Sequence, residues 1–314
     1  LHPGSIQGWR KRNYDYRRCI MRGKSALKLH ATAALFLLPA LFFIAVYIIY
    51  PIFDVVHLST LEWNGISPEK TYVGLENWKK LFSDKYFWGA AAHNILIAVL
   101  SIVIQMPFAI TLAFMLDRLG KKTGILKVIY YLPSLFSTTA VGLLFAFIYT
   151  PRNGVFTTIS KLLGGGVIDV LGNPNTSLLA VFSVICWTAI PYYMIFYLAA
   201  FSGLPQEIYE AAIIDGANLR QYFFSIALPM LKNSIKTACT LSLIGSLKYF
   251  DLVYIMTEGG PNYSSDLMAT YMYRITFKSR QMGYGSTIAV GMFIIITAFT
   301  YVFQYLINRN TKED

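Results

Sequence analysis

The residues best suited to recognising another molecule lie in a polar stretch, residues 202–232, between two apolar runs. Glu210 is followed by Ala211 and Ala212, and Asp215 comes three residues after the second alanine. A carboxylate in the N-terminal half of a helix meets the positive end of the helix dipole, and alanines let another protein approach closely. The pattern favours a surface helix that docks onto a partner. The alternative is a helix that only packs beneath its own bundle.

Capping signals around these residues predict two short helices. Pro205 suits the first turn of a helix, where its missing N–H would be unpaired in any case. Gly216 can adopt the positive φ that ends a helix. Asn218 is a good N-cap for a second helix, which we expect Pro229 to close. The stretch therefore predicts a rigid helix–turn–helix.

Lys248 and Asp251 stand out because they lie inside an otherwise apolar run. A charge within a membrane helix is costly and usually marks a pathway or a partner. Three residues apart on one helix, the two side chains could form an ion pair. Alternatively, Lys248 supplies positive potential for an anionic solute. The sequence leaves both interpretations open.

Other kinds of chemistry find little support. No G-x-x-x-x-G-K-[ST] phosphate-binding loop occurs, and the glycine run at 164–166 is typical of a turn. The three cysteines share no metal-ligand spacing, the four histidines are dispersed, and no nucleophile–base set is present. We therefore expect no enzymatic activity, no metal site and no cofactor bound by this chain.

Long apolar segments must position these residues. The 314-residue chain is 55% hydrophobic and only 14% charged, whereas soluble domains average about 25% charged residues. A bilayer core about 30 Å thick needs roughly 20 apolar residues per spanning helix. Six segments meet that need: 31–53, 88–116, 126–149, 177–201, 233–256 and 284–307. We predict an all-α membrane protein with one six-helix domain, residues 31–308, between a basic tail, 1–30, and a short charged tail, 309–314.

The basic residues are expected to lie on one side of the membrane. The net charge is +11, which could suggest nucleic acid binding. However, with a cytoplasmic N-terminus most of the 27 lysines and arginines, but fewer than half of the 16 acidic residues, fall in inner segments. This is the asymmetry of the positive-inside rule, and the basic tail can contact anionic lipid headgroups. We therefore expect both termini and residues 202–232 to be cytoplasmic, and no nucleic acid partner.

The polar stretch resembles the EAA loop of type I ABC importer permeases. The residues that carry this likeness are Glu210, Ala211, Ala212, Asp215, Gly216, Phe223, Ile226 and Pro229. The likeness extends over about residues 72–306 and is strongest to the sugar-permease branch, which contains the larger permease of the maltose importer. Its further segments are Tyr72 to Trp78, Tyr131 to Pro133, Trp187 to Tyr192 and Thr257 to Pro261. With six helices and no large external domain, the chain is similar to the shorter permeases that import uronate oligosaccharides such as alginate.

The resemblance implies a transport mechanism. The loop would be a coupling helix that fits a groove on a separate ABC ATPase dimer, which binds ATP and Mg²⁺. ATP-driven closure of that dimer would switch the bundle between inward-open and outward-open states. The other implied partners are a second, paralogous permease and an extracytoplasmic sugar-binding protein, at a bacterial cytoplasmic membrane. The alternatives are an ABC permease for a non-sugar solute and a stand-alone secondary transporter, although such a transporter would more often show an internal repeat.

The resemblance also suggests substrate-pathway residues near the proline-interrupted helices. Alignment to the maltose permease matches Tyr192 and Ser242 to sugar contacts, and Thr138 is a conservative equivalent. Ser134 and Ser246 stand where that permease has other residues, which implies a remodelled cavity, and Trp187 precedes the matched tyrosine. The alternative is that these side chains only form helix–helix hydrogen bonds.

Overall fold

The computed structural model describes residues 34–120 and 124–309. The predicted N-terminal tail therefore lies outside the described residues, as does the predicted C-terminal tail apart from Arg309. The described part is almost entirely helical, which confirms the all-α class. The chain divides into two compact units at the boundary between His57 and Leu58, and each unit is described separately.

The first unit contributes one apolar helix, Ala34–Leu58. It includes a π-helical segment, η1 (Ala45–Ile49), and α2 (Tyr50–Leu58). Its apolar side chains are exposed almost throughout, as expected of a helix that faces lipid or another subunit. The helix extends beyond the predicted segment 31–53 and ends at Leu58.

A change of hydrogen-bonding pattern accompanies three of the prolines that lie within helices. Three prolines, Pro51, Pro107 and Pro229, each lie two residues after a π-helical segment, and the residue before each proline donates its N–H to the carbonyl five residues back. A π turn accommodates one extra residue, which relieves the clash and the missing bond that a proline brings to a regular helix. The three segments are η1, η2 (Ser101–Gln105) and η5 (Tyr222–Ala227).

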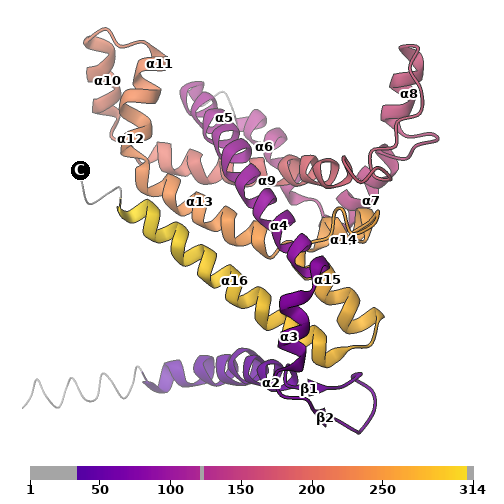
Figure 1. The fold of residues 1–314 in the computed structure, drawn as a ribbon. Coiled ribbons are helices and arrows are strands. Elements are labelled where there is room, and N and C mark those ends of the chain that lie inside the picture. Colours follow the sequence, from indigo (N-terminus) through magenta and orange to yellow (C-terminus); the bar gives the residue numbers. More distant parts are fainter. Residues whose placement is uncertain (1–33, 121–123, 310–314) are drawn as a thin grey trace, which may run out of the picture. The chain divides into compact units, whose positions relative to one another are not determined.

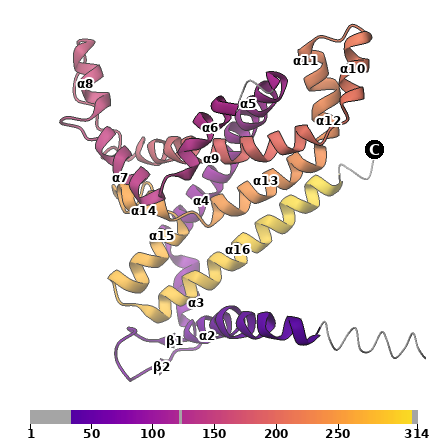
Figure 2. The same ribbon diagram turned by 180° about the vertical axis from the view of Figure 1, so that it is seen from behind.

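The second unit holds the remaining spans (Figures 1 and 2). Three are unbroken: Lys85–Arg118, formed by α4 (Lys85–Leu100), η2 and α5 (Met106–Arg118); α9 (Ser177–Ser202); and α16 (Met282–Arg309). Two are bent pairs. The elements α6 (Gly124–Tyr131) and η4 (Leu132–Leu135) meet α7 (Thr138–Ile148) at 89°, and α13 (Lys232–Leu247) meets α14 (Asp251–Thr257) at 41°. Counting each bent pair once, the described residues contain six candidate spans.

The sequence predicted one of these two bends and not the other. The predicted interruption of the third span by Pro133 is confirmed, since that residue lies in η4, the last turn before the bend. The predicted unbroken helix 233–256 is wrong. Buried Asn94 donates from Nδ2 to the carbonyls of Ser246, at 2.9 Å, and Leu247, at 3.1 Å. The amide thus binds two carbonyls in the last turn of α13, and the break is stabilised from another span.

Short elements join the spans at the end opposite α10 (Gln206–Ile214). They are the antiparallel pair β1 (Leu61–Glu62) and β2 (Thr71–Tyr72), then α3 (Glu76–Ser83), α15 (Met268–Tyr273) and η6 (Arg274–Lys278). Asp84 connects them: one oxygen caps α4 by accepting from the N–H groups of Tyr86 and Phe87, and the other accepts from the hydroxyls of Tyr271 and Tyr284. One carboxylate therefore joins three helices. A further short helix, α8 (Val155–Leu162), follows α7.

The core of this unit forms between neighbouring spans. The most extensive contact is between α5 and α9, which place Phe114 and Phe201 with ring centroids 5.7 Å apart. A second cluster includes Ile97, Val181 and Leu252 of α4, α9 and α14. These contacts hold the two ends of the bundle in a fixed relation within the unit.

Candidate functional site

The predicted helix–turn–helix is present and well capped. Helix α10 ends in a Schellman motif: Gly216 lies at φ +82°, its N–H donates to Ile213 O at 3.0 Å, and the N–H of Ala217 donates to Ala212 O at 2.9 Å. Asn218 then caps α11 (Leu219–Gln221). Pro205 is the N-cap of α10 rather than a first-turn residue.

A capping box also fixes the start of the second helix. Asn218 and Gln221 form a reciprocal capping box, with Asn218 Oδ1 accepting from Gln221 N at 2.9 Å and Gln221 Oε1 accepting from Asn218 N at 2.8 Å. The helix continues through η5 and α12 (Leu228–Met230), so it ends one residue after Pro229. The segment 202–232, hereafter the α10 loop, is therefore a locally determined unit.

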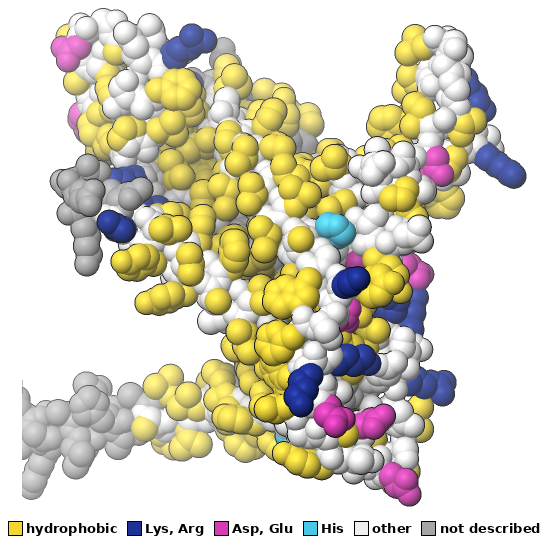
Figure 3. Space-filling model, viewed as in Figure 1, with side chains coloured by type: hydrophobic (Ala, Val, Ile, Leu, Met, Phe, Trp, Pro, Cys, Tyr) yellow, Lys and Arg dark blue, Asp and Glu magenta, His cyan; other side chains and the backbone are white. Residues whose placement is uncertain are grey.

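The predicted docking residues divide between two faces of the α10 loop. Glu210, Ala211, Asp215, Gly216 and Pro229 are exposed. Two large apolar neighbours are exposed with them: Ile213 and Ile214, the second at 84% of its maximal area. Figure 3 shows acidic side chains beside hydrophobic ones at this tip. The result is a mixed apolar and acidic surface at one end of the bundle.

The other predicted docking residues point inward. Ala212 and Phe223 are buried, and Ile226 is half-buried. The Phe223 ring lies 4.6 Å from Phe114 and 6.5 Å from Phe201. Phe223 therefore anchors the α10 loop to α5 and α9, and its buried ring is not accessible to a partner.

An arginine at the end of α5 forms a second anchor that the sequence analysis missed. The Arg118 guanidinium lies 4.2 Å from the ring centroid of Tyr209 and 5.3 Å from that of Tyr222. The same group donates to Asp117 Oδ2 from Nε at 3.0 Å and from Nη2 at 2.5 Å. Burial raises the pKa of Tyr222, so its phenol is neutral and presents a ring face to the cation. Helix α10 is thus connected directly to a membrane span.

A cavity beside the bend in the fifth span brings together three of the predicted pathway residues. Its volume is about 300 Å³, and Ser242, Ser246 and Lys248 line it. Ser246 donates to Ser101 Oγ at 3.1 Å, so part of its hydrogen-bonding capacity is used within the bundle. Tyr193, the neighbour of the predicted Tyr192, also lines the cavity.

Gln105 is a further lining residue that the sequence analysis missed. It is only 2% exposed, and among the described residues its Nε2 has no hydrogen-bond partner. A buried polar atom without a partner is unusual in a folded protein. The available signal was an amide side chain within the apolar run of the second span.

The structure does not form the ion pair considered for Lys248. Within the described residues, no salt bridge joins Lys248 to Asp251. Lys248 caps the end of α13, whereas Asp251 begins α14, so the two residues do not share one helical face. Both line the cavity, and Lys248 is exposed.

The remaining predicted pathway residues lie elsewhere. Trp187 lines a separate hollow of about 340 Å³ together with Pro133. Tyr192 is exposed and meets Tyr193 edge-on, with centroids 5.2 Å apart. Ser134 donates to Tyr131 O at 2.8 Å, and Thr138 is the half-buried first residue of α7. The structure therefore does not bring all seven predicted residues into one site.

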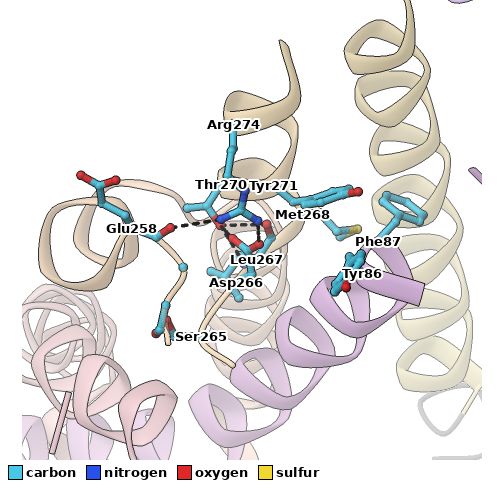
Figure 4. Close-up of polar contacts among 12 residues, drawn as sticks. Tyr86, Phe87, Glu258, Ser265, Asp266, Leu267, Met268, Thr270, Tyr271 and Arg274 are labelled. Carbon is cyan, nitrogen blue, oxygen red and sulfur yellow. Dashed lines mark hydrogen bonds and ion pairs between the residues drawn. The ribbon is translucent and has the colours of Figure 1, made fainter. Parts of the chain in front are cut away.

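Two polar features occupy the end opposite α10. A hollow of about 560 Å³ lies between the strand pair, α3 and α16, with Trp63, Asn77 and Tyr284 in its lining. Nearby, Figure 4 shows the Arg274 side chain directed at Asp266.

The Asp266 cluster is largely buried. Asp266 is 1% exposed, forms an ion pair with Arg274 and accepts from Thr270 Oγ1 at 2.7 Å. Arg274 also donates to Glu258 O at 3.3 Å and lies over the Tyr263 ring, 4.5 Å from its centroid. Burial raises the pKa of the Asp266 carboxyl, although the bond from Thr270 and the charge of Arg274 oppose the change. The cluster holds the α14–α15 connection against α15.

Comparison with known proteins agrees with this architecture. Residues 105–313 match the family described as the binding-protein-dependent transport system inner membrane component. The chain is 37% identical over 284 residues to a probable ABC transporter permease protein of Bacillus subtilis, covering 89% of this chain and 97% of that protein. It is 29% identical over 269 residues to the trehalose/maltose transport system permease protein MalF of Thermococcus litoralis, covering 86% and 91%.

A solved structure shows the same fold. It is that of a bacterial ABC transporter involved in the import of the acidic polysaccharide alginate, one chain of which superposes with a TM-score of 0.79 at 21% identity. The match covers 92% of this chain and 99% of the other. The chain therefore belongs to the family of binding-protein-dependent transport system inner membrane components and is a multi-pass ABC transporter permease.

Proposed function

We propose that this permease imports oligosaccharides by alternating access, driven by a separate ATPase dimer that docks on the α10 loop. The observation that carries the proposal is the exposed face of α10, where Ile213 and Ile214 lie beside Glu210 and Asp215. Exposed apolar side chains rimmed by charges are typical of a protein-binding surface. Because Arg118 and Phe223 connect this surface to α5, a force on the surface reaches the second span.

The ATPase supplies the energy in this scheme, and it binds ATP and Mg²⁺. The permease contributes two conformations whose populations change when the ATPase dimer closes. An extracytoplasmic sugar-binding protein delivers the solute at the end opposite α10, where the polar hollow near Trp63 and Tyr284 lies. A second, paralogous permease completes the pathway. In this arrangement both termini and the α10 loop are cytoplasmic.

The cavity near Lys248 supports a sugar substrate. Its serine hydroxyls, the Gln105 amide and the Tyr193 ring are groups that bind sugar hydroxyls and ring faces. Relatives named for sugar transport support the same class, including the trehalose/maltose permease. The exposed ammonium of Lys248 favours an acidic oligosaccharide. A non-sugar solute remains the alternative, because the α10 loop does not select the solute.

Co-purification tests the coupling part of the proposal. Affinity-tagged permease should retain an ATPase when extracted from membranes of its own cells, and Glu210→Arg should abolish that retention by placing a like charge against the surface that receives it. The matched control is Glu62→Arg in β1, which should leave the complex intact. Permease that purifies without an ATPase, or solute uptake by the permease alone without ATP, would refute the proposal.

Uptake by the reconstituted importer tests the substrate part. A hydrogen bond to a charged group contributes about 1.5–3 kcal/mol, so Lys248→Gln should raise the KM for an acidic oligosaccharide roughly tenfold to a hundredfold. A neutral oligosaccharide of equal length should be little affected. Lys161→Gln, a change in α8 outside the cavity, is the control. Equal effects of Lys248→Gln on acidic and neutral sugars would rule out charge recognition.

A further inference from the structure

Four aromatic rings form a continuous group beside the Lys248 cavity. Phe250 and Tyr254 lie at the start of α14, four residues apart, and their nearly parallel rings have centroids 5.1 Å apart. Tyr273 and Phe277, also four residues apart, lie at the end of α15 and in η6 with centroids 5.1 Å apart. Tyr273 joins the two pairs, at 5.4 Å from Phe250 and 4.9 Å from Tyr254. We name these four residues the aromatic track.

One end of the aromatic track belongs to the cavity. Phe250 lines the cavity together with Lys248 and Gln105. The fourth ring, Phe277, is 56% exposed. The aromatic track therefore leads from the Lys248 cavity to the surface of the described chain.

The exposed end of the aromatic track carries charged groups. Lys278 Nζ lies 2.6 Å from Glu258 Oε2 and 5.3 Å from the Tyr254 ring centroid. The side chains of Lys278 and Glu258 are 45% and 64% exposed. An ion pair in contact with the track is unexpected on a surface covered by lipid tails, because charges are costly there. Water and polar solutes are the expected neighbours of this end.

The Lys248 cavity lies at the lower end of the size range of sites that enclose a small ligand. Pockets that enclose small ligands span about 300–1,000 Å³, and this cavity has about 300 Å³. An oligosaccharide bound there must extend beyond it, and the aromatic track is continuous with its wall. We infer that the aromatic track binds successive sugar rings of an oligosaccharide that is entering the Lys248 cavity. This inference rests on the proposed function, since it assigns that same pathway a length-dependent site.

The contacts required of the aromatic track depend on ring faces rather than on hydroxyl groups. A tyrosine and a phenylalanine offer the same face to a sugar ring, so sugars of different identity can be held as they pass. Weak, repeated contacts also suit a pathway, because a transported solute must leave each position again. Longer chains contact more rings and therefore depend more strongly on the aromatic track.

Length-resolved uptake by the assembled importer in proteoliposomes tests the inference. The probes are maltose and maltohexaose, with the dimer and hexamer of polymannuronate as acidic counterparts. Loss of one aromatic contact should raise the KM for a hexamer roughly twofold to tenfold. Tyr273→Ala and Phe277→Ala should both show this change and leave the KM for the dimer as it was. Tyr273→Phe, which keeps the ring, should behave as the unmodified importer.

Phe293→Ala in α16 is the matched control, because Phe293 is equally exposed but lies outside the aromatic track. Equal effects on dimer and hexamer, or no effect of Phe277→Ala on either hexamer, would overturn the inference. Loss of importer assembly with Phe277→Ala on size-exclusion chromatography would also overturn it, since the aromatic track would then be a subunit interface. If the unmodified importer takes up none of the four sugars, the proposed function itself fails.

Discussion

Replacing Arg118 should separate ATP hydrolysis from transport. The guanidinium lies over the Tyr209 ring at 4.2 Å and is held in place by Asp117. Its side chain is only 22% exposed. A partly desolvated cation–π contact contributes about 1–2 kcal/mol, whereas the Asp117 pair, next to solvent, adds at most about 1 kcal/mol. Arg118→Ala should therefore weaken the anchor by about 2 kcal/mol.

That energy corresponds to a roughly thirtyfold change in the ratio of anchored to released α10 loop. The substitution leaves the proposed docking surface for the ATPase intact, so the complex should still assemble and hydrolyse ATP. Movement of the α10 loop should no longer be passed fully to α5. We expect fewer solute molecules imported per ATP hydrolysed, measured on the same proteoliposomes. Arg118→Lys keeps the charge but not the planar stack and should have an intermediate effect.

Arg220→Ala is the control for charge on the α10 loop, because Arg220 is exposed in α11. It should leave the ratio of import to ATP hydrolysis unchanged. An Arg118→Ala importer with the unmodified ratio would refute the anchoring role. Co-purification of the ATPase with this variant separates a coupling defect from a failure of assembly.

The remaining predictions concern the end opposite α10. Gly283→Ala should lower the melting temperature of the detergent-purified permease by several degrees, because a Cβ there would collide with the carbonyl oxygen of Leu61. Gly89→Ala is the control and should not lower it, because Gly89 has open space around it. Equal melting temperatures of the two variants would contradict the packing described. Because the folded-state pKa of Asp266 is raised, its contribution to stability is present below its ordinary pKa and is lost as the pH rises through the raised value. Asp266→Asn should flatten this dependence of the melting temperature on pH, whereas an unchanged profile would assign the dependence to other groups. Arg274→Ala should destabilise most at neutral pH, where it leaves a buried carboxylate unpaired.

Local signals predicted the parts of the structure that are determined locally. Gly216 and Asn218 cap their helices through bonds within five residues, so residue type and spacing were sufficient. Pro133 interrupts its span because a proline in a helix interior lacks a donor and clashes with the preceding turn. The lengths of the apolar runs predicted all six spans, because the thickness of the bilayer sets the length that a spanning helix needs.

The parts that sequence analysis missed depend on side chains from distant spans. The bend after Leu247 contains no proline, and Asn94 stabilises it from a span more than 150 residues away. The anchor between Arg118 and Tyr209 crosses from α5 to α10 in the same way. The inward position of Phe223 follows from which face of its helix meets α5, and the motif that marked this residue does not contain that information.

The π-helical segment between α4 and α5 has a consequence for the register of the second span. An α-helix turns about 100° per residue, and a π turn contains one extra residue. If Ser101–Gln105 became regular α-helix with all five residues kept, one half of the span would rotate by about 100° relative to the other. Asn94 could then meet the α13 carbonyls, or Arg118 could meet Tyr209, but both could not do so together. The wide turn, as much as the number of residues, therefore sets the phase between Asn94 at one end of the span and Arg118 at the other.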